Sequence, residues 1–144
     1  MQHKINIDSV CLLVSTHLKK YETNFTISDF EEYKELTWSA MLHFKDEEFD
    51  KSLKDFQQAF KIIPDENGSD YFFASASALN LSKNKVAKEL IIQAIKKTNA
   101  SENYFDSFNE FNYFRDNEFF SEIKRNYTKY QSDFYKGLKH PQIY

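Results

Sequence analysis

Two stretches of this chain correspond to each other and decide its fold: residues 36–64 read LTWSAMLHFKDEEFDKSLKDFQQAFKIIP, and residues 71–99 read YFFASASALNLSKNKVAKELIIQAIKKTN. A shift of 35 residues places small residues on small ones and large apolar residues on large apolar ones. Seven positions agree in this way: Leu36/Tyr71, Ala40/Ser75, Phe44/Leu79, Ser52/Ala87, Phe56/Ile91, Ala59/Ala94 and Phe60/Ile95. Paired helices approach to about 8–10 Å and need small residues where they cross, while large residues fill the space between pairs. The sequence therefore predicts two successive hairpins of antiparallel helices.

The composition favours helices throughout the chain. Of 144 residues, 41% are hydrophobic and 17% are aromatic, whereas Gly and Pro number only 2 each. A chain this rich in core residues folds, and it has too few turn residues for a sandwich or a barrel. We expect one all-α domain over residues 1–144, with about seven helices. Its expected parts are an N-terminal helix and link (1–27), three hairpins (28–66, 67–100 and 101–137) and a tail (138–144).

The N-terminal part is expected to contain a helix and a polar link. From Asp8 onward four apolar residues recur at helical spacing: Val10, Cys11, Val14 and Leu18. The β-branched residues among them leave a strand open as an alternative. Residues 22–26 form the link, and the next helix is expected to follow Ser28, whose spacing to Glu31 is that of a capping box.

A long helix is expected to end the last hairpin. Asn117 followed by Glu118 is typical of a helix start, and the helix would carry five apolar residues on one side: Phe120, Ile123, Tyr127, Tyr130 and Phe134. Residues 104–135 hold more aromatic side chains than we expect one hairpin to bury. Either the N-terminal helix folds over them or some of them form an interface. A homodimer through this third hairpin is one hypothesis that follows.

The repeat resembles the tetratricopeptide repeat family. That family repeats about every 34 residues. It places small residues where Ala40, Ser52 and Ala59 stand, and it ends its second helix near a proline, as at Pro64. The second copy has Asn99 in place of that proline. The resemblance implies a right-handed superhelical stack of antiparallel helical hairpins.

The chain departs from the family at its bulky first-helix position, which holds Leu36 and Tyr71 rather than Trp. Residues 111–120, FNYFRDNEFF, nevertheless resemble the terminating hairpin of many bacterial tetratricopeptide proteins. The matching residues are Phe111, Phe114, Arg115, Asp116, Phe120 and Ile123. In all, the resemblance covers about residues 31–128.

The resemblance also implies that the first helix of each hairpin lines a concave inner surface. In the 35-residue register nine residues would face a partner there: Lys34, Thr37, Met41, Phe44, Phe72, Ala76, Leu79, Asp106 and Glu110. An apolar groove with polar flanks suits an extended peptide or an amphipathic helix. Apolar stripes are also typical of a core. The alternative is therefore that Met41 and Phe72 pack against the N-terminal helix or the last helix.

No residue pattern typical of catalysis or metal binding occurs in the sequence. The four His residues are not spaced for shared metal ligation, and nucleotide-binding and nucleophile motifs are absent. Cys11 is the only Cys, so it supplies neither an intramolecular disulfide nor a thiolate zinc site. His43 stands at a packing position, and we expect it to be hydrogen-bonded and half-buried. We expect no metal, no cofactor and no enzymatic activity.

Charge and hydropathy restrict the partners further. The net charge of −3 gives no basic face of the kind that nucleic acids require, and no stretch approaches the ~20 apolar residues of a membrane span. We expect a cytoplasmic, non-catalytic interaction module, an adaptor or scaffold that binds a peptide or helix of another protein. The alternative is an immunity-like or inhibitor protein that occludes a toxin or effector enzyme.

Overall fold

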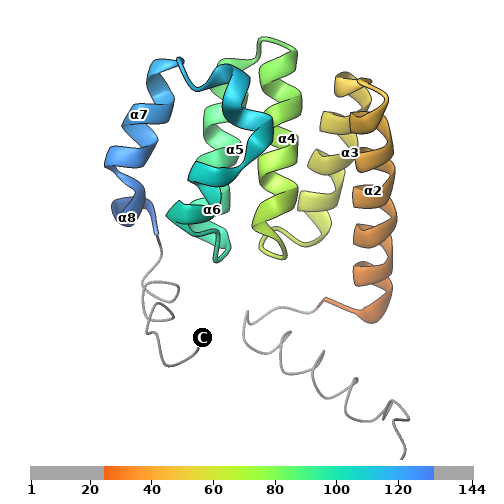
Figure 1. The fold of residues 1–144 in the computed structure, drawn as a ribbon. Coiled ribbons are helices and arrows are strands. Elements are labelled where there is room, and N and C mark those ends of the chain that lie inside the picture. The colour runs from red at the N-terminus through yellow and green to blue at the C-terminus, as the bar shows by residue number, and fades with distance from the viewer. Residues whose placement is uncertain (1–24, 132–144) are drawn as a thin grey trace, which may run out of the picture.

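A computed structural model describes residues 25–131, and every regular element in that range is helical (Figure 1). In chain order these are α2 (Ile27–Lys45), α3 (Phe49–Ile62), α4 (Gly68–Asn80), α5 (Asn84–Lys97), α6 (Glu102–Ser107), the 3-10 helix η1 (Asn109–Phe114), α7 (Glu118–Arg125) and α8 (Tyr127–Tyr130). The predicted all-α fold is confirmed for this part of the chain. The helix expected from Asp8 and the tail at 138–144 lie outside the described residues.

The two hairpins, α2–α3 and α4–α5, repeat with the 35-residue offset of the sequence. In each hairpin turn a backbone N–H donates to the carbonyl five residues earlier at 2.8 Å, from Glu48 in the first and from Lys83 in the second. The residue before it has a positive φ in both turns, 59° at Glu47 and 60° at Ser82. This is the Schellman ending of a helix, which most often has Gly at the positive-φ position. The repeat is therefore one of backbone geometry as well as of sequence.

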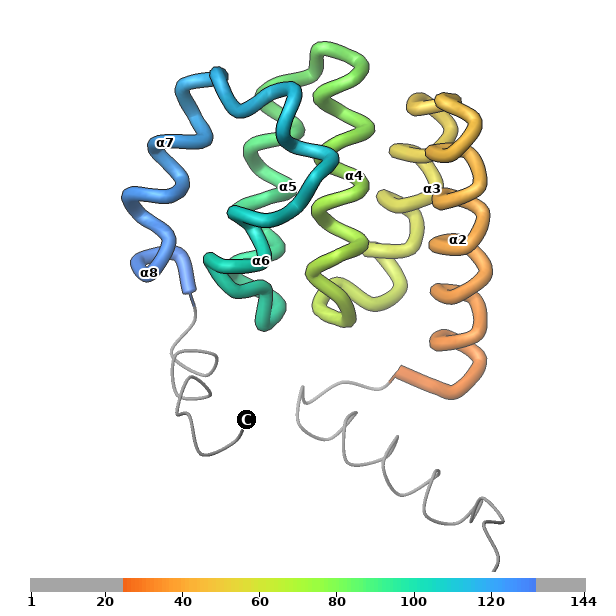
Figure 2. The backbone as a smooth tube through the Cα atoms, in the orientation of Figure 1, coloured from red at the N-terminus to blue at the C-terminus, as the bar shows by residue number. Residues whose placement is uncertain are grey.

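The helices of these hairpins pack in chain order, α2 on α3, α3 on α4 and α4 on α5 (Figure 2). α4 is the most enclosed, with nine of its 13 residues buried, whereas α2 buries three of 19. Small residues lie buried where helices meet. The Ser75 hydroxyl donates to the Ala87 carbonyl of α5 at 2.9 Å, and the Ser77 hydroxyl donates to Ser52 of α3 at 3.1 Å. The close approach that the small residues predicted is thus present on both sides of α4.

An aromatic cluster joins α4 to the third hairpin. The ring of Phe72 lies 5.3 Å from those of Phe108 and Phe111, and 6.0 Å from that of Phe105. Five aromatic residues of the region are buried: Phe105, Phe108, Phe111, Phe120 and Tyr127. These five are buried with the help of α4, which supplies part of their surroundings. Tyr113, in contrast, is 90% exposed.

The start of α2 differs from the sequence-based expectation. The capping box forms between Thr26 and Asp29, not between Ser28 and Glu31. Thr26 Oγ1 accepts from the Asp29 N–H at 3.0 Å, and Asp29 Oδ2 accepts from the Thr26 N–H at 2.9 Å. Thr-x-x-Asp offers the same reciprocal bonds as Ser-x-x-Glu, and here it places the helix start earlier.

The expected long last helix is interrupted. α7 ends at Arg125 and α8 begins at Tyr127, with Asn126 between them. The Asn126 side-chain amide donates to the Glu122 carbonyl at 2.9 Å. Such local bonds offer the backbone an alternative to helix continuation. Phe134, expected on this helix, lies outside the described residues.

Arg115 secures the irregular part of the third hairpin. Its Nη2 donates to the carbonyls of Phe105, Asp106 and Phe108 at 2.9, 3.1 and 3.0 Å. Its guanidinium also lies over the rings of Phe105 and Phe111, at 5.5 and 5.7 Å from their centroids. α6 is only six residues long, and helix ends leave carbonyls without partners. Arg115 satisfies those carbonyls, so the Arg of the terminating motif has a structural role here.

Within residues 25–131, no helix has the length and apolar character needed to cross a membrane.

Candidate functional site

An apolar groove of about 430 Å³ opens on one face of the molecule. It takes side chains from three elements that are distant in sequence: α2, α4 and η1. The residues that line this groove are Trp38, Met41, Leu42, Phe44, Lys45, Phe73 and Glu110.

α2 supplies five of these seven residues. Residues 38, 41, 42 and 45 are spaced by three and four, so they share one side of the helix. Trp38 is 71% exposed and Leu42 is 50% exposed. Single exposed apolar residues are common on protein surfaces, but large ones gathered at a groove mark interaction sites.

Ring packing holds the back of the groove. Phe44 and Phe73 pack edge to face with centroids 5.3 Å apart. Phe73 also lies 5.0 Å from Phe108, and Phe44 lies 5.4 Å from Phe49. Edge-to-face pairs contribute roughly 0.5–1.5 kcal/mol each beyond area burial. The apolar lining is therefore formed before any ligand arrives.

The groove also carries one charge of each sign. Lys45 comes from α2 and Glu110 from η1. Neither forms a salt bridge with another residue of the described range. Paired charges at an interface direct the orientation of a ligand more than they add affinity. A ligand with an acidic and a basic residue on either side of an apolar segment would match both.

The sequence matches no protein-family model. No curated protein and no solved structure matches it either. The resemblance to tetratricopeptide repeats therefore rests on the residues and on the repeated geometry alone.

The structure brings three of the nine predicted partner-binding residues together in the groove: Met41, Phe44 and Glu110. Phe72, Ala76 and Leu79 lie in the core instead and have no surface to offer a partner. Phe72 has a packing role, as in the alternative that we gave, and within the described residues it packs against α6 and η1.

The other three predicted residues lie apart from the groove. Thr37 is buried, and its hydroxyl donates to the carbonyl of Lys34 at 3.2 Å. Lys34 itself is exposed. Asp106 lines a different pocket beside Arg115, where its carboxylate accepts from Lys124 at 2.7 Å. Asp106 therefore contributes to the third hairpin and not to the groove.

Four groove residues were missed by the sequence analysis: Trp38, Leu42, Lys45 and Phe73. A signal was present, because Trp38 is the only Trp of the chain and Leu42 follows it by one helical turn. We assumed that α2 and α4 would present residues at corresponding positions of the 35-residue repeat to a partner. The described structure has no hairpin before α2, which leaves this side of α2 open.

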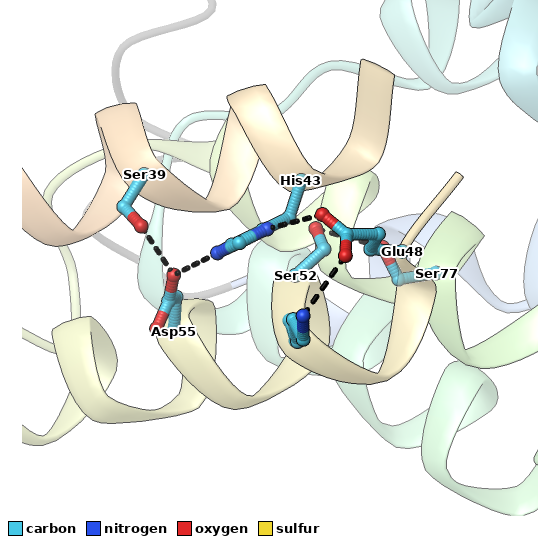
Figure 3. A network of polar contacts seen from close by, with 7 residues as sticks. Ser39, His43, Glu48, Ser52, Asp55 and Ser77 are labelled. Carbon is cyan, nitrogen blue, oxygen red and sulfur yellow. Dashed lines mark hydrogen bonds and ion pairs between the residues drawn. The ribbon is translucent and has the colours of Figure 1, made fainter. Parts of the chain in front are cut away.

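A polar network joins α2 to α3 (Figure 3). His43 Nδ1 lies 2.9 Å from Glu48 Oε1, and its Nε2 lies 3.8 Å from Asp55 Oδ2. Ser39 donates to Asp55 at 2.7 Å, and Lys51 donates to Glu48 at 2.9 Å. The His43 side chain is 30% exposed, so the prediction of a hydrogen-bonded, half-buried histidine is confirmed. Hydrogen bonds from Lys51 and then His43 lower the pKa of the Glu48 carboxyl.

This network contains Ser, His and Asp but connects them differently from a nucleophilic triad. In a triad the hydroxyl gives its proton to the imidazole, which the carboxylate orients. Here the hydroxyl of Ser39 donates to Asp55, and both nitrogens of His43 face carboxylates. The arrangement joins two helices, and the Ser39 hydroxyl donates to a carboxylate rather than to the imidazole of His43. In the part of the chain that the structure describes, no group of three or more His, Cys, Asp or Glu residues is placed to hold a metal ion.

Proposed function

We propose that this chain is a non-catalytic protein-interaction module whose groove binds a peptide or helix of another protein. The observation that carries the proposal is the exposure of Trp38 and Leu42 at the edge of a preformed apolar groove. Trp is among the residues most enriched at binding hot spots. Lys45 and Glu110 supply the polar flanks that fix the orientation of a bound segment.

We further propose a tetratricopeptide-like, right-handed superhelical stack as the architecture behind this groove. The shared Schellman turns at Glu47 and Ser82 support it, because they repeat with the offset of the sequence. The buried small residues Ala40, Ser75 and Ala87 support it too. Stacked hairpins present side chains of successive first helices to one side, as α2 and α4 do at the groove.

The expected affinity is moderate. Burying a Leu-sized apolar side chain contributes about 1.5–3 kcal/mol, and Trp38 and Leu42 are the two large exposed anchors of the groove. Association itself costs several kcal/mol. We therefore expect dissociation constants of roughly micromolar order rather than nanomolar.

The proposal is tested by capturing partners from lysate of the native host and measuring the affinity of the purified partner. Met41→Glu places a carboxylate in the apolar groove, and we expect it to weaken binding at least about tenfold, or roughly 1.4 kcal/mol. Tyr113→Glu is the matched control, because Tyr113 is 90% exposed and lies outside the groove. Both variants must keep the native helical melting curve. A partner that binds Met41→Glu as tightly as the native chain would contradict the proposal.

A further inference from the structure

One side of α4 is covered by the preceding hairpin. Asp70 accepts a hydrogen bond from the hydroxyl of Tyr33 in α2 at 2.7 Å, and Ser77 donates to Ser52 in α3 at 3.1 Å. Phe73, on the same side, packs on an aromatic ring of α2. This side of α4 is therefore the surface that packs against the hairpin preceding it in the chain.

The same side of α2 has no such cover from residues 25–131. In the 35-residue register, Asp70, Phe73 and Ser77 correspond to three residues of α2: Glu35, Trp38 and Leu42. All three are exposed. We call them the end face of α2. Because α2 repeats the turn and register of α4, its end face has the form of a helix-packing surface.

We propose that residues 8–21 dock on the end face as a helix that runs antiparallel to α2. The length of chain outside the described residues fits this occupant. α3 has 14 residues, and residues 63–67 link it to α4. Residues 8–21 are also 14 in number, and a five-residue link, 22–26, joins them to α2. The chain thus offers a segment of the same length on a link of the same length. Because α2 begins six residues earlier in the register than α4, this segment would reach Trp38 near its own N-terminal end.

The side chains of this segment are complementary to the end face. Ser52 faces Ser77 across α3 and α4 at almost equal distances from their link. The same antiparallel register places Val10 opposite Trp38. It also brings the basic Lys19 and Lys20 within about one helical turn of Glu31. Apolar residues then meet apolar ones, and basic residues meet an acidic one.

The inference does not rest on the proposed function, because it requires no partner protein. It does affect the groove, since Trp38 and Leu42 belong both to the end face and to the groove. A docked segment would cover part of the apolar surface that a partner would otherwise reach.

Trp38 is the only Trp of the chain and therefore reports directly on this surface. The experiment measures acrylamide quenching and the emission maximum of Trp38 in the full chain, beside Val10→Asp and Thr16→Asp. Both variants add one charge to the same segment. Val10 belongs to the apolar stripe, whereas Thr16 is on the opposite side of a helix. We expect slow quenching in the native chain and in Thr16→Asp, with quenching at least about threefold faster in Val10→Asp.

Three outcomes would overturn the inference. One is a native Trp38 that is quenched as freely as N-acetyl-tryptophanamide, a result that stands even where Val10→Asp fails to fold. Another is protection that survives in a folded Val10→Asp variant. The third is protection that disappears on dilution, because a second copy of the chain would then be the occupant. None of these results depends on whether the groove binds a partner.

Discussion

α2 and α4 are related by the same 35-residue offset, yet they have different surroundings. Both end in the same Schellman turn, at Glu47 and at Ser82. α4 is packed on both sides, whereas one side of α2 is open in the described residues. The core residue Phe72 corresponds to Thr37, and the exposed Trp38 corresponds to the packed Phe73. The helices that surround a residue, more than its position in the 35-residue repeat, decide whether its side chain is buried or exposed.

We expect the largest loss of stability at the position where the surroundings of α2 and α4 differ most. Phe72→Ala removes the ring at the centre of the aromatic cluster, and we expect a loss of about 3–5 kcal/mol of unfolding free energy. Thr37→Ala, at the corresponding position of α2, is expected to cost about 1 kcal/mol, because it removes one hydroxyl and one methyl group. Chemical denaturation measures both. Equal losses would mean that the two positions have equivalent surroundings after all.

A smaller loss is expected at the start of α4. A Cβ added to Gly68 would lie 2.6 Å from Thr98 Oγ1 and 2.9 Å from the Ala100 Cβ. Gly68→Ala should therefore force the link after α5 away from α4, at a cost of about 1–3 kcal/mol. The neighbouring Ser69→Ala should change stability by no more than about 0.5 kcal/mol. A Gly68→Ala variant as stable as the native chain would show that the start of α4 and the link after α5 are not in close contact.

The shared turn geometry predicts a shared gain. Glu47→Gly and Ser82→Gly relieve a positive φ that is unfavourable for residues with a Cβ by about 1–2 kcal/mol, less the entropy of Gly, about 0.5–1 kcal/mol. Each variant should be stabilised by up to about 1 kcal/mol, and by similar amounts. Thermal melts measure all three variants. Lys83→Gly, where φ is −95°, should be less stable than the native chain. Effects of opposite sign at the two turns would contradict the conclusion that they share one backbone geometry.

The smallest effect depends on pH. Burial raises the pKa of the Asp70 carboxyl, outweighing the hydrogen bond from Tyr33, which lowers it. Below the unfolded value of about 3.9, Asp70 is protonated in both states and carries no penalty. As pH rises through the raised folded pKa, the native chain loses stability relative to Asp70→Asn, which keeps an acceptor for Tyr33.

The control for this pH effect is the counterpart of Asp70 on α2. Glu35 is exposed, and Glu35→Gln should change stability by no more than about 0.5 kcal/mol. Unfolding is measured for each variant between about pH 3 and pH 7. A stability difference between Asp70→Asn and the native chain that shrinks as pH rises would have the wrong sign and contradict the burial of Asp70.

Periodicity was enough to predict the helices of both hairpins, because the apolar spacing, the small residues and the proline at position 64 all agree there. The second hairpin was expected within residues 67–100, and its helices span Gly68–Asn80 and Asn84–Lys97. The third hairpin was less predictable. Its apolar pattern does not reveal that Asn126 interrupts the last helix.

The candidate site was only partly predictable for a related reason. Met41, Phe44 and Glu110 were expected to face a partner and do line the groove. Phe72 and Leu79 were placed beside them by register, but both are buried, and Phe72 lies against aromatic rings of the third hairpin. A register states which residues share a side of a helix. It does not state what lies against that side, and this depends on contacts between residues far apart in the sequence.

Each helix of the two hairpins packs mainly on its neighbours in the chain. This arrangement predicts the order in which the helices unfold locally. Contacts between chain neighbours close short loops at little entropic cost, and proteins built from them fold fast. In such arrays local opening begins at the ends and moves inward. Amide protons of α4 should then exchange with solvent last, and those of α2 and α8 first. α4, the most enclosed of these helices, is then also the one that keeps its hydrogen bonds longest.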